Sequence, residues 1–313
     1  MSAPSEPVTL VVDAGGAHLA RGLAAVERRL LEVAGAAGEP VAGGASETIA
    51  AGGKRLRPLL VLLAAGDDSD AVIRAAVAVE LVHAATLVHD DVLDVASLRR
   101  GRPTVWATGG RDAAIATGDH LFARAFSELV VNGDAEQVRV LSRASSALAE
   151  GELLQRADAF RAIPVERYLR RCELKTAALF EAACELGDLI AARPPALAAF
   201  GRSIGLAFQI LDDVLDVSGP AERTGKHRGT DLLDGTVTLP FILSGLPLPE
   251  LSSPEEAERL CDEIAGTGAL DRARAHALRL VAEAKSSLPA DGLTAAQRDA
   301  LLLVADGVVE RYS

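Results

Sequence analysis

The sequence contains the same acidic hexapeptide twice, at residues 90–95 and 212–217. In each copy the first and last aspartates are four residues apart, which places both carboxylates on one face of a helix. Apolar residues flank both copies, and charges in such surroundings need partners. Grouped carboxylates suit a hard cation such as Mg²⁺, which keeps waters and also binds phosphate oxygens. The sequence therefore predicts metal ligands at Asp90, Asp91, Asp94, Asp212, Asp213 and Asp216.

Basic side chains bracket both acidic copies. Lys54 and Arg57 lie three residues apart at a helix start marked by glycines, where anions bind readily. His83 lies seven residues before Asp90, which is two helical turns away on the same face. Each cation alone is typical of a solvated surface, but the set predicts a site for a metal-bound diphosphate with an apolar tail. The further cations of this set are Arg99, Arg100, Lys175 and Lys226.

Two other interpretations of the acidic copies are disfavoured. A solvated acidic face would not lie within apolar runs or repeat so closely. A di-iron helical bundle would use Glu together with a Glu-x-x-His pattern, and neither copy supplies one. His89, beside Asp90, is expected to pack or form hydrogen bonds rather than to act as a catalytic base.

The elements that must position these residues are predicted to be helices. Residues 71–95 contain no Gly or Pro and are apolar on almost every face, which is typical of a central helix. Loops are expected at 35–44 and 222–235, and the whole chain, 1–313, is expected to form one all-α domain. Further helical segments are predicted at 10–32, 59–65, 111–131, 136–157, 165–190, 196–217, 238–243, 255–265, 269–288 and 295–311.

Composition narrows the function class. Hydrophobic residues make up 49% of the 313 residues and aromatics only 3%, and the Ala and Leu that dominate favour helices. The net charge of −12 and the lack of a basic stripe argue against nucleic-acid binding. Three scattered cysteines predict a reducing cytoplasm. With no signal peptide and no uncharged membrane span, we expect a soluble cytoplasmic protein without membrane insertion.

The ordered motifs resemble those of the trans-type isoprenyl diphosphate synthases, the polyprenyl synthetase family. The resemblance runs from about Gly52 to Arg311. It implies an isoprenoid synthase fold, a helical bundle around a deep central cavity, and a homodimer. The motifs that carry it are residues 52–58, the first acidic copy with 99–104, Gly118-Asp119, Lys175-Thr176, 208–213 and 225–231.

The resemblance also implies a reaction and a role for each site residue. Isopentenyl diphosphate would condense with an allylic diphosphate bound with three Mg²⁺ ions, and released diphosphate would take the final proton. Asp90, Asp94 and Asp212 would be the principal ligands, with Asp91, Asp213 and Asp216 as further ligands or as supports of the ligands. Isopentenyl diphosphate would bind Lys54, Arg57, His83 and Arg100, the allylic diphosphate would bind Arg99, Lys175 and Lys226, and Thr176 and Gln209 would face the allylic carbon.

One position departs from the family pattern. Members usually carry a second lysine after the loop that follows the second acidic copy, and this chain has Thr236 there. One contact to the allylic diphosphate is thereby lost, unless another cation such as Arg228 substitutes.

Product length is predicted from the residues below Asp90. Ala85 and Thr86 lie about one turn away, roughly 6 Å along the axis, where aromatic residues stop products at farnesyl length in the family. Both are small here, and Val82 and Ala78 continue the opening. Phe122 and Phe126 would form a deeper floor, so we expect a geranylgeranyl or longer product.

Four alternatives stay open. A farnesyl diphosphate synthase differs only in product length. A class I terpene cyclase would share the fold but normally lacks the second acidic copy. A regulatory synthase subunit tends to lose acidic motifs, whereas this chain keeps both. A non-isoprenoid acceptor is disfavoured because Lys54, Arg57 and His83 suit a diphosphate.

Overall fold

The computed structural model describes residues 6–38, 41–99, 101–219 and 228–310. In the described part of the chain, the regular secondary structure is helical apart from one antiparallel hairpin, β1 (Leu98–Arg99) and β2 (Arg102–Pro103). The predicted all-α class is therefore confirmed. The chain divides into two compact units. Unit 1 comprises Met1–Ser145, Glu181–Ala198 and Pro289–Val304, and unit 2 comprises Ser146–Phe180, Ala199–Leu288 and Ala305–Ser313. The single domain over 1–313 stays a prediction.

Unit 1 is built around one long helix, α5 (Asp70–Leu93). Residues 75–82 of this helix are all buried. Of the described helices, only α5 is long and apolar enough to cross a membrane, and 67% of its most apolar window is buried inside the protein, as in a core helix. The unit also contains α1 (Glu6–Gly15), α2 (Ala17–Gly35), α3 (Val41–Ala50), α4 (Leu56–Ala65), α6 (Val105–Val131), and parts of α7 (Ala135–Asp158), α9 (Ala178–Ile190) and α16 (Ala295–Glu310).

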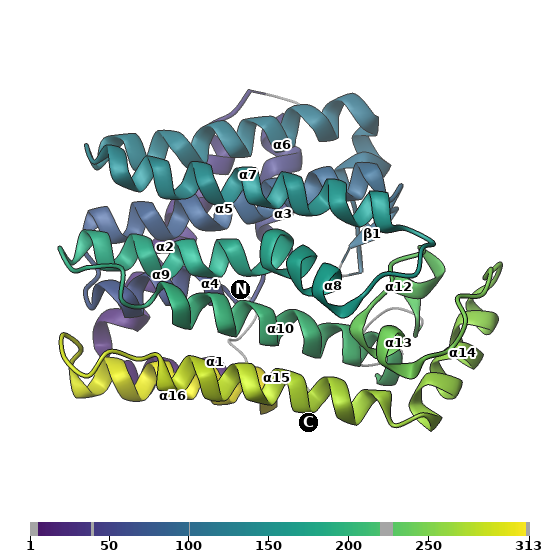
Figure 1. Ribbon diagram of the computed structural model, residues 1–313. Helices are drawn as coiled ribbons and strands as arrows, with labels where there is room; N and C mark the ends of the chain where they lie inside the picture. The colour runs from purple at the N-terminus through teal and green to yellow at the C-terminus, as the bar shows by residue number, and fades with distance from the viewer. Residues whose placement is uncertain (1–5, 39–40, 100, 220–227, 311–313) are drawn as a thin grey trace. The chain divides into compact units, whose positions relative to one another are not determined.

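Helix α6 runs antiparallel to α5 and packs against it, and both helices are labelled in Figure 1. The amide of Asn132, just past the end of α6, donates to the carbonyl of Ala71 in the first turn of α5 at 3.0 Å. At the other end of the pair, Gly118 of α6 lies against the ring of His89 of α5. These two contacts set the register between the helices.

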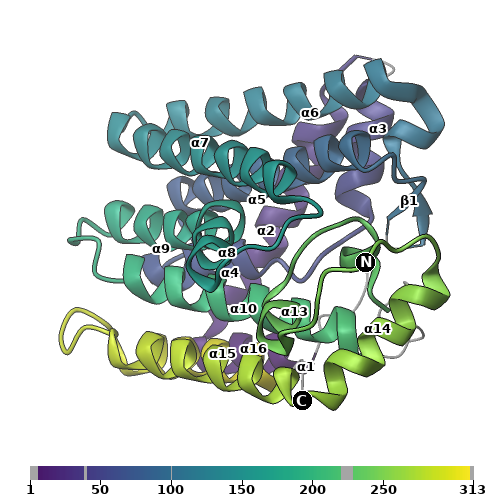
Figure 2. The ribbon, with the colours of Figure 1, turned by 45° about the vertical axis from the view of Figure 1, so that its right-hand side comes forward.

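Unit 2 is centred on α10 (Ala198–Ser218), whose buried residues include Phe200, Ile204, Ile210 and Leu211. Helices α13, α14 and α15 pack against one another (Figure 2). The helices of this unit, besides parts of α7, α9 and α16, are α8 (Val165–Cys172), the π-helical turn η1 (Glu173–Ala177), α12 (Thr230–Leu233), α13 (Leu239–Ser244), α14 (Pro254–Gly266) and α15 (Ala269–Ser286).

Four local predictions need correction. The helix predicted at 10–32 is interrupted at Gly16, whose φ of 100° is open to glycine. The loop predicted at 35–44 ends early, because α3 begins at Val41. The helix predicted at 165–190 contains the π-turn η1. Residues 230–233 of the loop predicted at 222–235 form α12, while 222–227 lie outside the described residues.

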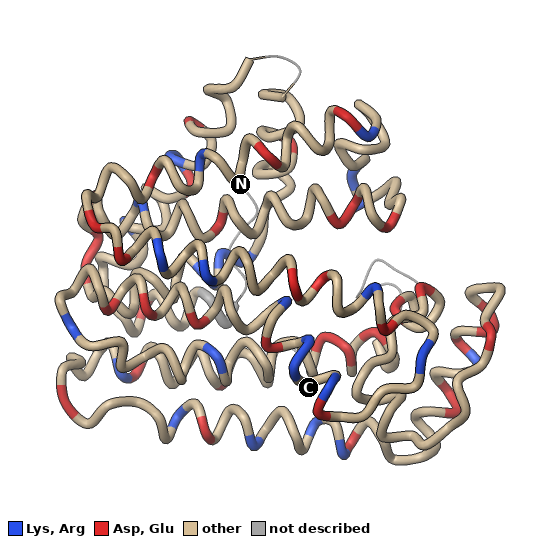
Figure 3. The backbone as a smooth tube through the Cα atoms, turned by 45° about the horizontal axis from the view of Figure 1, so that its top comes forward, with Lys and Arg blue, Asp and Glu red and all other residues tan. Residues whose placement is uncertain are grey.

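Charged residues are distributed along the helices of both units, with acidic and basic residues interspersed (Figure 3). Some of the ion pairs that they form are buried. Glu128 of α6, whose side chain is 2% exposed, accepts from Arg29 of α2 at 2.9 Å and from Arg74 of α5 at 3.1 Å. Such a buried pair requires both partners, because removing one leaves an uncompensated charge.

Candidate functional site

The first acidic copy forms the end of α5. Asp90 and Asp91 lie in the last turn, and the amide of Asp94, the residue after the helix, donates to the carbonyl of Asp90 at 2.8 Å. The three carboxylates differ in their surroundings. Asp94 is exposed and Asp90 half-buried, whereas Asp91 is only 4% exposed. Two of the three carboxylates are thus accessible to a cation.

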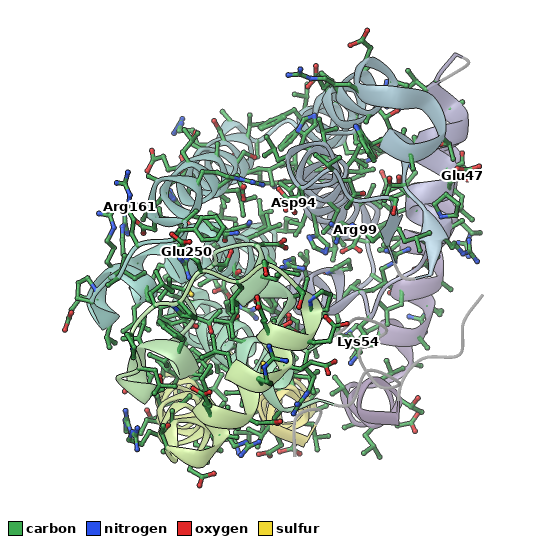
Figure 4. All side chains as sticks on the ribbon, turned by 90° about the vertical axis from the view of Figure 1, so that its right-hand side faces the viewer. Glu47, Lys54, Asp94, Arg99, Arg161 and Glu250 are labelled. Carbon is green, nitrogen blue, oxygen red and sulfur yellow. The ribbon has the colours of Figure 1, made fainter. Side chains whose placement is uncertain are left out.

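The inward carboxylate, Asp91, is paired with a residue of the hairpin. The Nε of Arg99 donates to its Oδ1 at 2.7 Å. Arg99 and Asp94 are both labelled in Figure 4, at the same end of unit 1. The hairpin is tied to the next helix by Thr104, whose hydroxyl donates to the carbonyl of Ala96 at 2.6 Å and accepts from the amide of Ala107 at 3.1 Å. Arg99 is therefore fixed beside the acidic copy, while Arg100 lies outside the described residues.

The predicted acceptor residues lie on α5 and before and within α4. Lys54 is exposed, two residues before α4 begins (Figure 4). Arg57 lies in the first turn, where burial lowers the pKa of its guanidinium to about 10 and the Glu80 carboxylate opposes that shift. The guanidinium remains protonated at neutral pH. Half-buried His83 follows Glu80 by three residues on α5. In unit 1, Glu80 therefore interacts electrostatically with Arg57 and lies one helical turn from His83.

The predicted chain-length residues lie on the packed faces of α5 and α6. Ala85 is fully buried. Thr86 is half-buried, and its hydroxyl donates to the carbonyl of His83 at 2.8 Å, so it presents its methyl group outward from the helix. Phe122 and Phe126 are half-buried, one and two turns beyond Gly118 on α6. Phe122 stacks on His89, which lies one turn of α5 closer to the acidic copy than Ala85, and Phe126 lies one turn further along α6.

His89 packs against α6. Its ring stacks on that of Phe122, with centroids 5.9 Å apart, and its Nε2 lies 3.4 Å from the Asp119 carboxylate. A Cβ on Gly118 would be only 2.2 Å from His89 Nε2, so glycine is needed at 118 for this contact. These contacts agree with the packing role expected for His89.

The second acidic copy lies within α10. Asp212 is exposed and Asp216 half-buried, whereas Asp213 is 3% exposed. The hydroxyl of Tyr168 donates to Oδ2 of Asp213 at 2.7 Å, and Nε2 of Gln209 donates to Oδ1 at 2.7 Å. Burial and the Asp231 carboxylate raise the pKa of Asp213, and the two hydrogen bonds oppose that rise. Both copies therefore have the middle aspartate turned inward and hydrogen-bonded.

Thr176 and Gln209, both expected from the family resemblance to face the allylic carbon, contact each other. The Thr176 hydroxyl donates to Oε1 of Gln209 at 2.6 Å. Thr176 belongs to the π-turn η1, a widened turn of a kind found often at functional sites. Two glycines make room for it. A Cβ on Gly151 would be 2.6 Å from the amide nitrogen of Lys175, and one on Gly205 would be 2.7 Å from Cα of Ala177.

Lys175 of η1 belongs to a polar network that includes Thr236. Its ammonium is ion-paired with Glu152 of α7 and donates to Oε1 of Gln155 at 3.2 Å. The Gln155 amide in turn donates to the Thr236 hydroxyl at 3.4 Å. The Thr236 position therefore belongs to the same side-chain network as Lys175.

The two cations considered for the loop after α10 stand differently. Nη2 of Arg228 donates to the Asp262 carboxylate of α14 at 2.7 Å and to the carbonyl of Glu258 at 3.4 Å. Lys226 lies outside the described residues.

Four residues that sequence reasoning missed adjoin the predicted ones: Tyr168, Asp231, Gln155 and Glu80. The amide of Asp231 donates to Oδ2 of Asp216 at 3.4 Å, and the Asp231 carboxylate raises the pKa of Asp213. The sequence offered a clue to Glu80, which is a lone acidic residue in the apolar stretch of α5, and to Asp231, which is the last residue of the 225–231 motif. The partners of Tyr168 and Gln155 come from segments distant in sequence.

The acidic copies suit a Mg²⁺ ion that takes its remaining ligands from water and substrate. Among the described residues, no group of three or more His, Cys, Asp and Glu side chains is arranged to hold a metal ion. Each copy instead turns two carboxylates outward, four residues apart. Mg²⁺ is usually bound by one or two carboxylates together with waters and substrate phosphates, so this donor set suits it.

Comparison with known proteins places this geometry in a family. The chain is 44% identical over 228 residues to the heptaprenyl diphosphate synthase component 2 of Geobacillus stearothermophilus, covering 70% of this chain and 71% of that protein. It is 38% identical to the geranylgeranyl diphosphate synthase of Methanosarcina mazei, covering 83% and 86%.

A solved structure agrees along almost the whole chain. The polyprenyl synthase of Caulobacter crescentus, complexed with calcium and isoprenyl diphosphate, superimposes with a TM-score of 0.86 at 35% identity and covers 95% of this chain and 98% of that one. Residues 40–277 match the sequence family described as polyprenyl synthetase. The all-α fold is accordingly the isoprenoid synthase fold, and the chain belongs to the polyprenyl synthetase family.

Proposed function

We propose that this protein is a Mg²⁺-dependent trans-prenyltransferase that condenses isopentenyl diphosphate with an allylic diphosphate. The observation that carries the proposal is that both acidic copies turn two carboxylates outward in a chain of the polyprenyl synthetase family. The names of the relatives support it, since they are heptaprenyl, geranylgeranyl and octaprenyl diphosphate synthases.

The outward carboxylates are the proposed metal ligands, namely Asp90 and Asp94 in the first copy and Asp212 and Asp216 in the second. Three Mg²⁺ ions are expected with bound substrate, and when bound they offset the charge of the departing diphosphate. Asp91 and Asp213 were predicted as further ligands or as supports of the ligands. Because both are buried and hydrogen-bonded, we assign them to orienting Arg99 and Gln209 instead.

The basic residues are proposed to hold the two diphosphates. Lys54, Arg57 and His83, with Arg100, bind the diphosphate of isopentenyl diphosphate. Arg99 and Lys175, with Lys226, bind that of the allylic substrate. Charge-assisted hydrogen bonds from the donors on the allylic diphosphate stabilise the negative charge that develops as the allylic carbon–oxygen bond breaks.

The carbon chemistry needs no protein base in this proposal. The allylic cation forms as diphosphate departs, the double bond of isopentenyl diphosphate attacks it, and the released diphosphate takes the proton that is lost. Thr176 and Gln209, hydrogen-bonded to each other at 2.6 Å, place oxygen atoms where they can face the cationic carbon.

Incubation of the purified protein with farnesyl and isopentenyl diphosphates tests the proposal. The expected product is geranylgeranyl or longer, and EDTA should abolish its formation until excess Mg²⁺ restores it. Farnesyl diphosphate as the terminal product would instead identify a farnesyl diphosphate synthase. Release of a hydrocarbon without isopentenyl diphosphate would identify a terpene cyclase.

Ala85→Phe tests the assignment of product length. Ala85 is fully buried in α5, one turn from His89, the residue on which Phe122 stacks. A phenyl ring there should shorten the product. Ala78→Phe, about two turns further along α5, is the matched variant, and it should shorten the product less. An unchanged product distribution in Ala85→Phe would refute the assignment.

Assembly and location are also proposals. We propose a cytoplasmic homodimer that is active without another subunit. Two relatives are named as component 2 of heptaprenyl diphosphate synthase, which raises a heteromer as the alternative. Light scattering after size exclusion, combined with the assay above, distinguishes them. An isolated chain without activity, rescued by a second protein, would support the heteromer.

A further inference from the structure

Arg55, between Lys54 and Arg57 in sequence, has an unusual backbone conformation. Its φ of 48° and ψ of 34° are left-handed, and it is the N-cap residue of α4. A left-handed conformation is unfavourable for a residue with a Cβ, so side-chain contacts must hold it. The carbonyl of Arg55 accepts the first hydrogen bond of α4, from the amide of Leu59 at 2.9 Å.

The Arg55 side chain joins four helices of unit 1. Its Nε and Nη2 donate to Glu27 of α2, at 2.5 and 3.3 Å, and Nη1 donates to Glu80 of α5 at 2.6 Å. Nη2 also donates to the carbonyl of Ile49 near the end of α3 at 3.0 Å. The Arg55 side chain is 10% exposed, that of Glu80 6% and that of Glu27 33%. The start of α4 is thus fixed to α2, α3 and α5 by one guanidinium.

Glu80 links Arg55 to the acceptor residues, so Arg55 with Glu27 and Glu80 is called the Arg55 anchor below. The Glu80 carboxylate accepts a hydrogen bond from Arg55 and also favours the charged form of Arg57, two residues further along the chain. A charged carboxylate in the buried part of α5 is costly unless it is paired. Arg55 supplies that partner, and the position of α4 brings Arg57 to the same carboxylate.

We propose that Arg55 and Glu80 are positioning residues for acceptor binding. They hold the segment 54–57 so that Lys54 and Arg57 can grip the diphosphate of isopentenyl diphosphate, without touching it themselves. The inference rests on the proposed function, and it adds two residues that are not part of the predicted site.

The test is Glu80→Gln, which keeps the side-chain shape and removes the charge. The KM for isopentenyl diphosphate should rise about tenfold, which corresponds to about 1.4 kcal/mol of lost binding. The KM for the allylic substrate should stay within about twofold, because Arg99 is paired with Asp91 and Lys175 with Glu152 rather than with the Arg55 anchor. Arg55→Lys, which cannot make the forked contacts to Glu27 and Glu80, should give the same pattern.

Glu128→Gln is the matched control. Glu128 is also a buried carboxylate paired with arginines in unit 1, but its partners are Arg29, Arg74 and Arg124, none of which belongs to segment 54–57. This variant should lower the melting temperature and leave both KM values unchanged. If Glu80→Gln unfolds, Glu27→Gln loosens Arg55 from a more exposed position, and it should raise the same KM about threefold.

Two results would overturn the inference. The KM for isopentenyl diphosphate could stay unchanged in folded Glu80→Gln or Glu27→Gln, or both KM values could rise equally. Failure of the proposed function is distinguishable, because then the wild-type protein would form no elongated product at all.

Discussion

The contact between Gly118 and His89 gives a sharp test of the packing of α5 on α6. A methyl group at Gly118 would lie 2.2 Å from Nε2 and 2.4 Å from Cδ2 of His89. The ring cannot move away freely, because it stacks on Phe122. Overpacking of this kind costs about 1–3 kcal/mol. Replacing a helical glycine by alanine returns about 0.5–1 kcal/mol. Gly118→Ala should therefore destabilise the protein by about 1 kcal/mol, and by at most about 2.5 kcal/mol.

The same substitution should change sign when the ring is absent. In a His89→Ala background the clash is removed, and Gly118→Ala should stabilise the protein by the helix term alone, about 0.5–1 kcal/mol. The coupling free energy of the double-mutant cycle then equals the overpacking cost, about 1–3 kcal/mol. Urea unfolding of the four proteins measures it.

A second glycine provides the control. A Cβ added at Gly35, at the end of α2, would meet nothing within 4 Å, so Gly35→Ala should have the same effect in both backgrounds. If Gly118→Ala also had the same effect with and without His89, the proposed clash would be refuted.

Three further predictions concern the buried groups. Asp91→Asn should lower the free energy of unfolding by about 1.5–3 kcal/mol, because it weakens a buried hydrogen bond between charged groups. Asp94→Asn should lower kcat and leave the urea midpoint almost unchanged. Equal losses of stability in the two variants would contradict this prediction. Tyr168→Phe should also cost about 1.5–3 kcal/mol in urea unfolding, and a loss below about 0.5 kcal/mol would count against its hydrogen bond. Burial raises the pKa of Cys172 and Cys261 to about 12, so at pH 8 both are neutral thiols; Ellman's reagent should modify them only after unfolding, and fast labelling of the native protein would refute the burial.

The sequence was most informative about the central helix and the acidic copies. The helix predicted at 71–95 is α5 at 70–93, because a long apolar segment without Gly or Pro readily forms a buried helix. The family resemblance named Thr176 and Gln209 as residues facing the allylic carbon, but their hydrogen bond joins positions 33 residues apart and could not be predicted.

Other features depend on contacts between distant segments and could not be predicted from local pattern. The inward direction of Asp91 depends on Arg99 in a hairpin, and that of Asp213 on Tyr168 in α8. The π-turn η1 has no sequence signature of its own, and the glycines that accommodate it, Gly151 and Gly205, lie in α7 and α10.

The inward middle aspartates bear on how these hexapeptides can be reused in protein engineering. Each copy has its own internal partner, Arg99 for the first and Tyr168 with Gln209 for the second. A hexapeptide grafted onto another helix without such a partner would bury a bare carboxylate, and the host would lose stability before it gained any affinity for a cation. The smallest transferable module is therefore the hexapeptide together with the donor that satisfies its middle aspartate.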